Sequence, residues 1–340
     1  MTSLERVLAA LSGEAADRRA LSLTLSLYGA RLAGIAPHSY YRDPLLYLRG
    51  QEAAVARFDS DIVFAPFALA LEGEAYGATL AWYDDAPPNV KRPLGSAREA
   101  VLVGPKGPAE APGLAFIVES VRRLSSRFEG EKPVAAILTA PIDLPALVIG
   151  LDAWLDTLLF DKVLANELFD LGVAHFVAMS RACFAAGAAF VVSPVMLVNP
   201  KLLTRELIEG QALPTLARAF SAAGGPLVFH HGAIGIGSSL EFLRELPGVA
   251  GFVIDQRDDY ASARAVLGPG RLILGGFSGP LMERCGPDTM RKLAKRALDA
   301  MGSDPAAILA STAADIPWDT PAETIDAVIG EVRRRGGEKG

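Results

Sequence analysis

The 340-residue chain is 51% hydrophobic, which is enough apolar sequence for the core of one large α/β domain. A formal net charge of −6 gives no general attraction to nucleic acid or to an anionic membrane, so neither is an expected partner. The two cysteines, Cys183 and Cys285, are too few for a cysteine-rich metal cluster and favour a reducing compartment. We therefore expect a cytoplasmic protein that acts on a small molecule.

Eight short runs rich in Val, Ile and Leu recur along the chain, and a stretch of helical periodicity follows most of them. Near-continuous apolar runs are typical of strands buried on both faces of a parallel sheet. The runs span residues 21–27, 61–67, 133–140, 188–194, 226–231, 251–256, 271–276 and 307–312. Eight such units predict a closed (β/α)8 TIM barrel. No G-x-G-x-x-G fingerprint follows the first run to indicate a dinucleotide-binding sheet.

The spacing of the runs also predicts the domain organisation. We expect a single barrel domain over residues 1–340 with an N-terminal helical segment over 1–20. A long insert, about residues 70–130, separates the second run from the third. Its segment "ATLAWYDDAPPNVKRPLG" (78–95) predicts a strand or hairpin arm followed by a proline-rich loop over the barrel mouth.

Two adjacent histidines stand at the end of the fifth run. The segment "PLVFHHGAIG" (226–235) contains His230 and His231, and the active sites of such barrels lie at the carboxyl ends of the strands. We expect the pair to be catalytic, as a general acid or base or as a donor to the substrate. Because neighbouring side chains of a strand point to opposite faces, one ring can equally be a packed core histidine.

Asp255 ends the sixth run. A carboxylate at the end of an apolar strand is costly without a partner. We therefore expect either a catalytic role beside the histidines or a salt bridge to Arg257 or Arg264. The strand ends and the loops after them also supply the expected substrate-binding residues, which are Tyr28, Arg31, Phe67, Glu74, Ser193, Met196, Gly276 and Thr312.

Other polar and aromatic residues have two interpretations. Glu72 follows the second run, either as a residue of the mouth or as a solvated loop carboxylate. Tyr40, Tyr41, Trp82 and Tyr83 could stack on a planar ligand, or they could pack within the protein.

Four segments carry a resemblance to a known family. They are "RVLAALSGEAADR" (6–18), "FDSDIVFAPFALALEGEAYGA" (58–78), "GFVIDQRDDYASARAVLGPGRLILGGF" (251–277) and "ILASTAADIPWDTPAETIDAVIGEV" (308–332). In order and spacing they resemble the uroporphyrinogen decarboxylase superfamily, and within it the methylcobamide:coenzyme M methyltransferase branch. The resemblance implies the barrel fold, a homodimer, and methyl transfer between a corrinoid (cobalamin), free or on a partner protein, and a small acceptor.

Two departures indicate that the chain does not decarboxylate porphyrinogens. The decarboxylases carry a pair of arginines after the first strand that binds substrate carboxylates. The corresponding segment here, "LYGARLAGIAPHSYYRDP" (27–44), retains Arg31 but not the pair. The decarboxylases also have Gly-Asn-x-Asp-Pro after the seventh strand, where this chain has "GGFSG" (275–279).

The similar thiol methyltransferases hold zinc through His-x-Cys-Gly after the fifth strand and a cysteine after the eighth. Here the resemblance leaves His231 as a metal ligand and places Ala314 at the last cysteine, so zinc would need replacement ligands. Without thiol-activating cysteines, the expected acceptor is a pterin of the folate type or a thiol activated in another way. A decarboxylase or lyase acting on a small acid, or a non-catalytic relative that binds a tetrapyrrole or corrinoid, are the alternatives.

Overall fold

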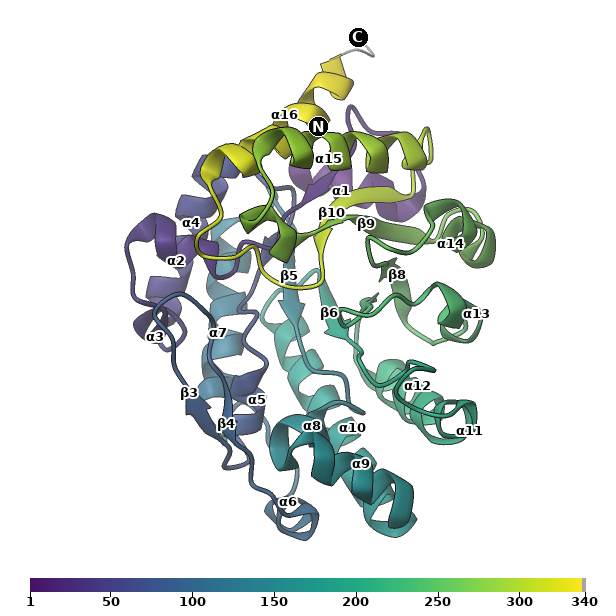
Figure 1. Ribbon diagram of the computed structural model, residues 1–340. Coiled ribbons are helices and arrows are strands. Elements are labelled where there is room, and N and C mark those ends of the chain that lie inside the picture. Colours follow the sequence, from purple (N-terminus) through teal and green to yellow (C-terminus); the bar gives the residue numbers. More distant parts are fainter. Residues whose placement is uncertain (338–340) are drawn as a thin grey trace.

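The computed structural model describes residues 1–337, and eight parallel strands form its centre with helices around them (Figure 1). The order around the sheet is β1-β10-β9-β8-β7-β6-β5-β2. These strands are β1 (Leu21–Ser22), β2 (Val63–Phe64), β5 (Val134–Ile137), β6 (Phe190–Pro194), β7 (Leu227–His230), β8 (Val249–Val253), β9 (Leu272–Ser278) and β10 (Ala307–Thr312). Every apolar run overlaps one of them, which confirms the predicted (β/α)8 barrel.

The seam between β1 and β2 is closed largely by side chains. The backbone N–H of Asp61 donates to the carbonyl of Leu21 over 2.8 Å, and the Asp61 carboxylate accepts from the N–H of Leu21 over the same distance. The N–H of Leu23 donates to the Ser60 hydroxyl over 2.9 Å. These bonds join the two ends of the sheet, as a closed barrel requires.

The helices belong mostly to the outer layer of the barrel, and several short ones stand in the loops. Those up to β5 are α1 (Ser3–Ser12), α2 (Tyr28–Ala33), α3 (Pro37–Tyr40), α4 (Pro44–Phe58), α5 (Ala70–Glu74), α6 (Ala97–Val103) and α7 (Pro112–Arg127). Those after β5 are α8 (Leu144–Ile149), α9 (Leu151–Phe160), α10 (Lys162–Ala185), α11 (Arg205–Leu207), α12 (Leu213–Ala222), α13 (Leu240–Leu243), α14 (Tyr260–Leu267), α15 (Pro287–Met301) and α16 (Ala322–Gly337).

The expected N-terminal helical segment closes the amino end of the barrel. Val7 of α1 belongs to the same apolar cluster as the inward-facing strand residues Val228 and Ile308. A small apolar void of about 20 Å³ separates these side chains. Helix α1 thus covers the amino end of the barrel, and a ligand site is expected at the carboxyl ends of the strands.

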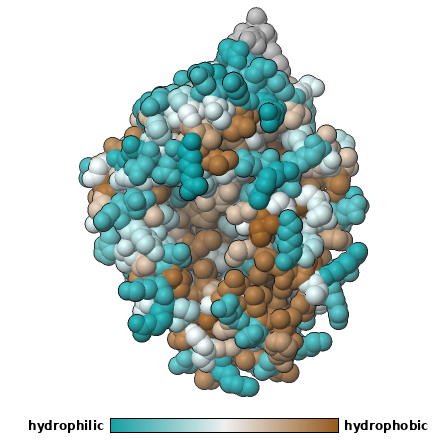
Figure 2. All heavy atoms as spheres, viewed as in Figure 1, coloured by the Kyte–Doolittle hydropathy of each residue, from teal (hydrophilic) through white to brown (hydrophobic). Residues whose placement is uncertain are grey.

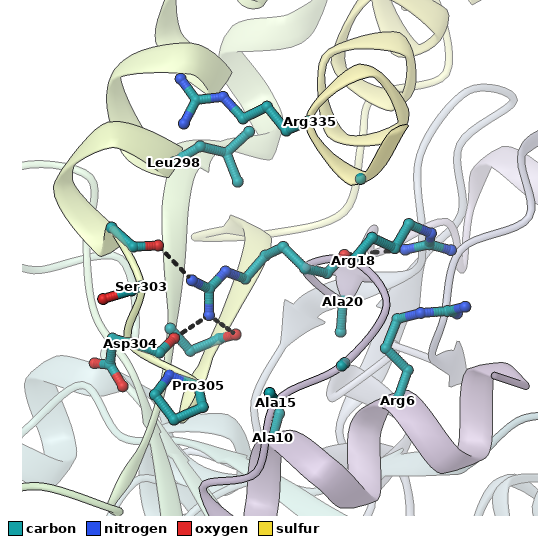
Figure 3. A pocket seen from close by; sticks show the side chains of 15 residues that line it. Arg6, Ala10, Ala15, Arg18, Ala20, Leu298, Ser303, Asp304, Pro305 and Arg335 are labelled. Atoms are coloured by element: carbon teal, nitrogen blue, oxygen red, sulfur yellow. Dashed lines mark hydrogen bonds between the residues drawn. The ribbon is translucent and has the colours of Figure 1, made fainter. Parts of the chain in front are cut away.

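A larger cavity of about 140 Å³ lies at the amino end of the barrel, and arginines bound to other parts of the protein line it (Figure 3). Arg19 donates there to the backbone carbonyls of Gly302, Asp304 and Ala307. Arg6 and Arg18, which also line the cavity, both pair with Asp61. These guanidinium groups are bound to the protein itself, and this face of a barrel contributes stability rather than chemistry.

The insert contains the expected hairpin, formed by β3 (Thr79–Ala81) and β4 (Asn89–Arg92). Trp82 follows β3 and packs edge-on against His38 of α3, with 4.5 Å between the ring centroids. The guanidinium of Arg42 lies over the Trp82 ring, with 4.8 Å between its central carbon and the ring centroid. The hairpin therefore lies against α3, and its position over the barrel mouth stays a prediction.

Within residues 1–337, only α10 is long and apolar enough to span a membrane, judged by length and composition alone. Half of that stretch is buried inside the protein. Cys183 lies on its buried side, and burial raises the pKa of this thiol to about 12, so it is not a nucleophile.

Candidate functional site at the carboxyl end of the barrel

A cavity of about 30 Å³ lies inside the carboxyl end of the barrel. Its apolar wall comes from six strands, β2, β5, β6, β8, β9 and β10, and includes Phe64 and Phe190. Its polar wall is formed by Ser22, Thr24 and Ser311 together with His230, which stand among the apolar side chains.

His230 points into this cavity because of the alternation along β7. Leu227 and Phe229 belong to the core between sheet and helices, whereas Val228 and His230 face the barrel interior. The backbone N–H of Gly232 donates to Nδ1 of His230 over 3.1 Å. In the neutral ring the proton is therefore on Nε2, the nitrogen left free to donate. Burial, and then the neighbouring His231, hold the pKa of His230 well below its usual value.

His231 lies behind His230 and does not point to the opposite face. Strand β7 ends at His230, and Gly232 turns the chain with a φ of +57°. The two rings stack with 4.5 Å between their centroids and 18° between their planes. The expectation that strand alternation would separate the rings is therefore wrong, because alternation ends where the strand ends. A β-carbon on residue 232 would lie 2.7 Å from the carbonyl oxygen of Val195, so this turn requires glycine.

His231 connects two strained loops. Its Nε2 accepts a hydrogen bond from the N–H of Ala313 over 3.2 Å. Ala313 has a φ of +75°, and Ala233, two residues after His231, has a φ of +68°. Positive φ costs an alanine about 1–2 kcal/mol and persists where the surroundings enforce it. The two loops follow β10 and β7, at the end of the barrel where active sites form.

The Asp255 carboxylate lies next to the ring of His231. Its Oδ2 lies 3.5 Å from Nδ1 of His231, a distance that gives attraction without a good hydrogen bond. Arg257 donates to both carboxylate oxygens and thus forms the expected salt bridge, whereas Arg264 pairs with Asp304. Burial raises the pKa of Asp255, but hydrogen bonds from Arg257 outweigh it and keep the pKa below its usual value. Asp255 is therefore ionised at neutral pH.

These residues do not fit a zinc ion. Among residues 1–337, no group of three or more His, Cys, Asp or Glu side chains could hold a metal ion. Nε2 of His231 is taken by Ala313, the Asp255 carboxylate by Arg257, and Ala314 has no ligand atom. Zinc sites need at least three protein ligands. No step is therefore assigned to zinc, and the metal role predicted for His231 has no support from the neighbouring donor atoms.

Among the expected substrate-binding residues, Phe67 lines the cavity. Tyr28 and Arg31 lie outside it and both donate to the carbonyl of Thr320. Glu74 does not line the cavity and forms a bidentate ion pair with Arg42.

The other four expected residues also lie outside the cavity wall. Ser193 faces the helical layer, since Phe190, Val192 and Pro194 on alternate positions take the inner face. The Met196 side chain is 39% exposed. A side chain on residue 276 would collide with Leu309, and the Thr312 hydroxyl donates to the carbonyl of Phe277 over 3.3 Å.

The three hydroxyls of the cavity wall are not among the residues predicted from the sequence. Ser22 and Thr24 occupy alternate positions of the first run, and Ser311 lies next to them on β10. Polar residues at alternate positions of an otherwise apolar strand are the signal that could have identified them. Thr24 donates through its N–H to the Ser311 hydroxyl over 2.9 Å, which fixes this side of the wall.

Burial decides between the interpretations given for Glu72 and for two of the tyrosines. Glu72 is fully buried, and its carboxylate lies 3.0 Å from Nε2 of His175 and accepts from Thr139. Tyr40 and Tyr41 are also fully buried and pack edge-on with 5.2 Å between their ring centroids. Glu72 is therefore not a solvated loop carboxylate, and the two tyrosines pack within the protein instead of stacking on a ligand.

A family model described as Uroporphyrinogen decarboxylase (URO-D) matches residues 2–335. The chain belongs to the uroporphyrinogen decarboxylase family. A methylated-thiol–coenzyme M methyltransferase from Methanosarcina mazei is 24% identical over 286 residues, which cover 82% of this chain and 72% of that protein. The resemblance stated from the sequence is thereby confirmed.

Solved structures with a similar fold also match this chain. A methyltransferase from Methanosarcina mazei matches with a TM-score of 0.83 at 17% identity, over 98% of this chain and 99% of that one. A B12-independent methionine synthase from a Shewanella species matches with a TM-score of 0.55 at 12% identity, over 94% and 97% of the two chains. The first match extends the barrel likeness over nearly the whole chain.

Proposed function

We propose that this member of the uroporphyrinogen decarboxylase family is a methyltransferase that moves a methyl group between a corrinoid and a small acceptor. Its methyltransferase relatives support the reaction class. One observation carries the assignment of the site: the neutral imidazole of His230, fixed by the Gly232 N–H, presents Nε2–H to the cavity.

A neutral imidazole in this position is a hydrogen-bond donor, not a general acid or base. Nδ1 is occupied, and protonation of the ring is disfavoured by burial and by His231. Such a donor stabilises the partial negative charge that develops on a heteroatom as it loses a methyl group. The same transition state is crossed in the reverse direction, when that heteroatom accepts the methyl group. His231 and Asp255 act as positioning residues, because they hold the ring stack and do not line the cavity.

The decarboxylase alternative requires cationic groups for the carboxylate of its substrate. Among residues 1–337, no lysine or arginine lines the cavity, and the one arginine retained from the decarboxylase pattern, Arg31, is bound to backbone carbonyls. The cavity therefore favours methyl transfer over decarboxylation of a small acid. The other alternative is a non-catalytic relative, and measurable methyl transfer would exclude it.

An exposed apolar patch supports docking of a corrinoid-carrying partner protein. Six exposed side chains form it, and they are Leu102, Val103, Leu151, Leu159, Phe160 and Val163. They come from α6, α9 and the start of α10, and the brown area in the lower part of Figure 2 lies over this region. Because α8 and α9 follow the carboxyl end of β5, the patch extends outward from the barrel mouth. Exposed apolar patches mark protein interaction sites.

The test is an anaerobic assay with free methylcobalamin as methyl donor, followed by loss of the cobalt–carbon absorbance. Acceptors would be 2-mercaptoethanesulfonate, another simple thiol and tetrahydrofolate. We expect turnover that falls about 10²–10³-fold in His230→Phe and is unchanged in His38→Phe, whose ring packs on Trp82 outside the cavity. Absence of turnover with every acceptor, or equal turnover in the His230 variant, would overturn the proposal.

The partner surface has its own test. Phe160→Ser combined with Val163→Ser should leave the reaction with free methylcobalamin unchanged and weaken the reaction with a methylated corrinoid protein. Equal loss in both reactions would assign the patch to folding instead of docking. A stable dimer of this chain by sedimentation, dissociated by the same substitutions, would assign it to a second copy.

A further inference from the structure

The polar groups of the cavity stand on opposite sides of the barrel. Strands β1 and β7 are separated by four places in the ring of eight, so they face each other across the interior. Ser22 on β1, with Thr24 and Ser311 beside it, faces His230 on β7. Apolar side chains fill the wall between the two polar sides.

Two of these polar groups are free to bind a ligand. Within residues 1–337, neither the hydroxyl of Ser22 nor Nε2 of His230 has a protein partner, although both residues line the cavity. The hydroxyls of Thr24 and Ser311 instead lie 3.4 Å apart and contact each other. A ligand placed between Ser22 and His230 would therefore meet one hydroxyl and one N–H donor.

The composition of the wall excludes a charged ligand group. In the part of the chain that the structure describes, no Lys, Arg, Asp or Glu lines the cavity, and burial keeps the imidazole of His230 neutral. Moving an ion into such a site without a counter-charge is strongly unfavourable. Neither Cys nor Met lines the wall, so no sulfur atom is available to contact a soft ligand.

The volume limits the size of the group that enters. A cavity of about 30 Å³ holds roughly two or three waters. This space suits a group of a few non-hydrogen atoms, while the rest of a larger molecule would remain in the mouth near Phe67 and Ala314.

We propose that the cavity binds an uncharged oxygen-bearing group, such as a small alcohol or the methyl ether end of a larger molecule, between the Ser22 hydroxyl and His230 Nε2–H. The role of this group as methyl acceptor or methyl-bearing substrate rests on the proposed methyltransferase function. Its binding does not, because the cavity and its donors are present without turnover. An anionic thiol substrate would then keep its charged end outside the barrel.

Saturation-transfer NMR with three probes of matched size tests the proposal. 1-Propanol, propionate and propylammonium differ in charge at one end and share a short apolar chain. We expect 1-propanol to bind in the millimolar range, as its few atoms allow, and each ion at least tenfold more weakly. His230→Phe and Ser22→Ala should each weaken 1-propanol binding about five- to tenfold, whereas His38→Phe should not change it.

Propionate or propylammonium binding as well as 1-propanol would overturn the proposal. So would 1-propanol binding that survives unchanged in both cavity variants. Ser22→Ala removes one hydroxyl and keeps the result interpretable if His230→Phe fails to fold, as judged by its circular dichroism. Selective 1-propanol binding without methyl transfer would contradict the proposed function alone, and methyl transfer without selective binding would contradict this inference alone.

Discussion

The connection between His231 and the loop after β10 predicts a measurable loss of stability in His231→Leu. The His231 ring is 1% exposed and accepts from the N–H of Ala313 over 3.2 Å. Leucine fills most of the same space but accepts no hydrogen bond. An unsatisfied buried donor costs about 1–3 kcal/mol. Because Ala313 is only half-buried, we expect a loss of about 1–2 kcal/mol in the free energy of unfolding.

The substitution should leave no unpaired charge. Asp255 keeps both of its carboxylate oxygens bonded to Arg257, so removal of the His231 ring adds little electrostatic cost. His231→Gln supplies an acceptor oxygen and should recover part of the lost free energy. This ordering, wild type above Gln and Gln above Leu, distinguishes loss of the hydrogen bond from general damage to packing.

The effect also depends on pH. Burial is the main cause that lowers the pKa of His231 below its usual value of 6.5, although Asp255 opposes it. The unfolded chain therefore binds more protons than the native state as pH falls below about 6.5. The stability contributed by neutral His231 is present above this pH and is lost as pH falls through the native pKa. His231→Leu should lack this part of the acid destabilisation.

Urea denaturation followed by circular dichroism at pH 7.5 and pH 5.5 measures both effects. His38→Leu is the matched control, since that ring is exposed and packs on Trp82. Wild-type stability of His231→Leu at pH 7.5 would refute the role of the hydrogen bond. If His231→Leu loses as much free energy of unfolding between pH 7.5 and pH 5.5 as the wild type does, the role assigned to neutral His231 is refuted.

Three further predictions test other parts of the structure. Burial raises the pKa of Asp315 to about 8, so the stability contributed by its protonated form is lost as pH rises from about 4 through 8. In the wild type this loss lowers the free energy of unfolding by at most ~1.4 kcal/mol per pH unit. Urea denaturation from pH 5 to 9 should show that Asp315→Asn lacks this pH dependence. Gly172→Ala drives a β-carbon into the carbonyl of Pro141 and should cost about 1–3 kcal/mol in thermal or urea unfolding, whereas Gly330→Ala, in open space on α16, should stabilise by about 0.5–1 kcal/mol. Cys183 is buried with its pKa raised to about 12, so a thiol reagent at pH 7.5 should modify it only in urea; modification under native conditions would contradict this burial.

The fold was predictable from the sequence because buried parallel strands leave a simple signal. Strands such as β5 and β7 are apolar on both faces, and each apolar run therefore stands out from the polar loops around it. The barrel also follows from their number and spacing. The direction of single side chains past a strand end was not predictable, since His231 is placed by the turn at Gly232 and not by alternation.

The candidate site was predictable only in part for a related reason. The rule of strand ends identified His230 and Phe67, which line the cavity, and Asp255, which supports it through His231. The same rule also selected Ser193, which faces the helices. Position at a strand end does not by itself show whether a side chain points into the barrel or toward the helices. Long-range contacts, such as that between Glu72 and His175, leave no local sequence signal.

The central claim is that His230 is a neutral imidazole that presents Nε2–H to the cavity. Nitrogen-15 NMR of the histidine rings tests this most directly, with His230 assigned by the signal lost in His230→Phe. The structure predicts an unprotonated Nδ1 and a protonated Nε2 at pH 8 and at pH 7, since burial and the neighbouring His231 hold the pKa of this ring well below its usual value. Two protonated nitrogens at pH 7, or a proton on Nδ1, would contradict the claim.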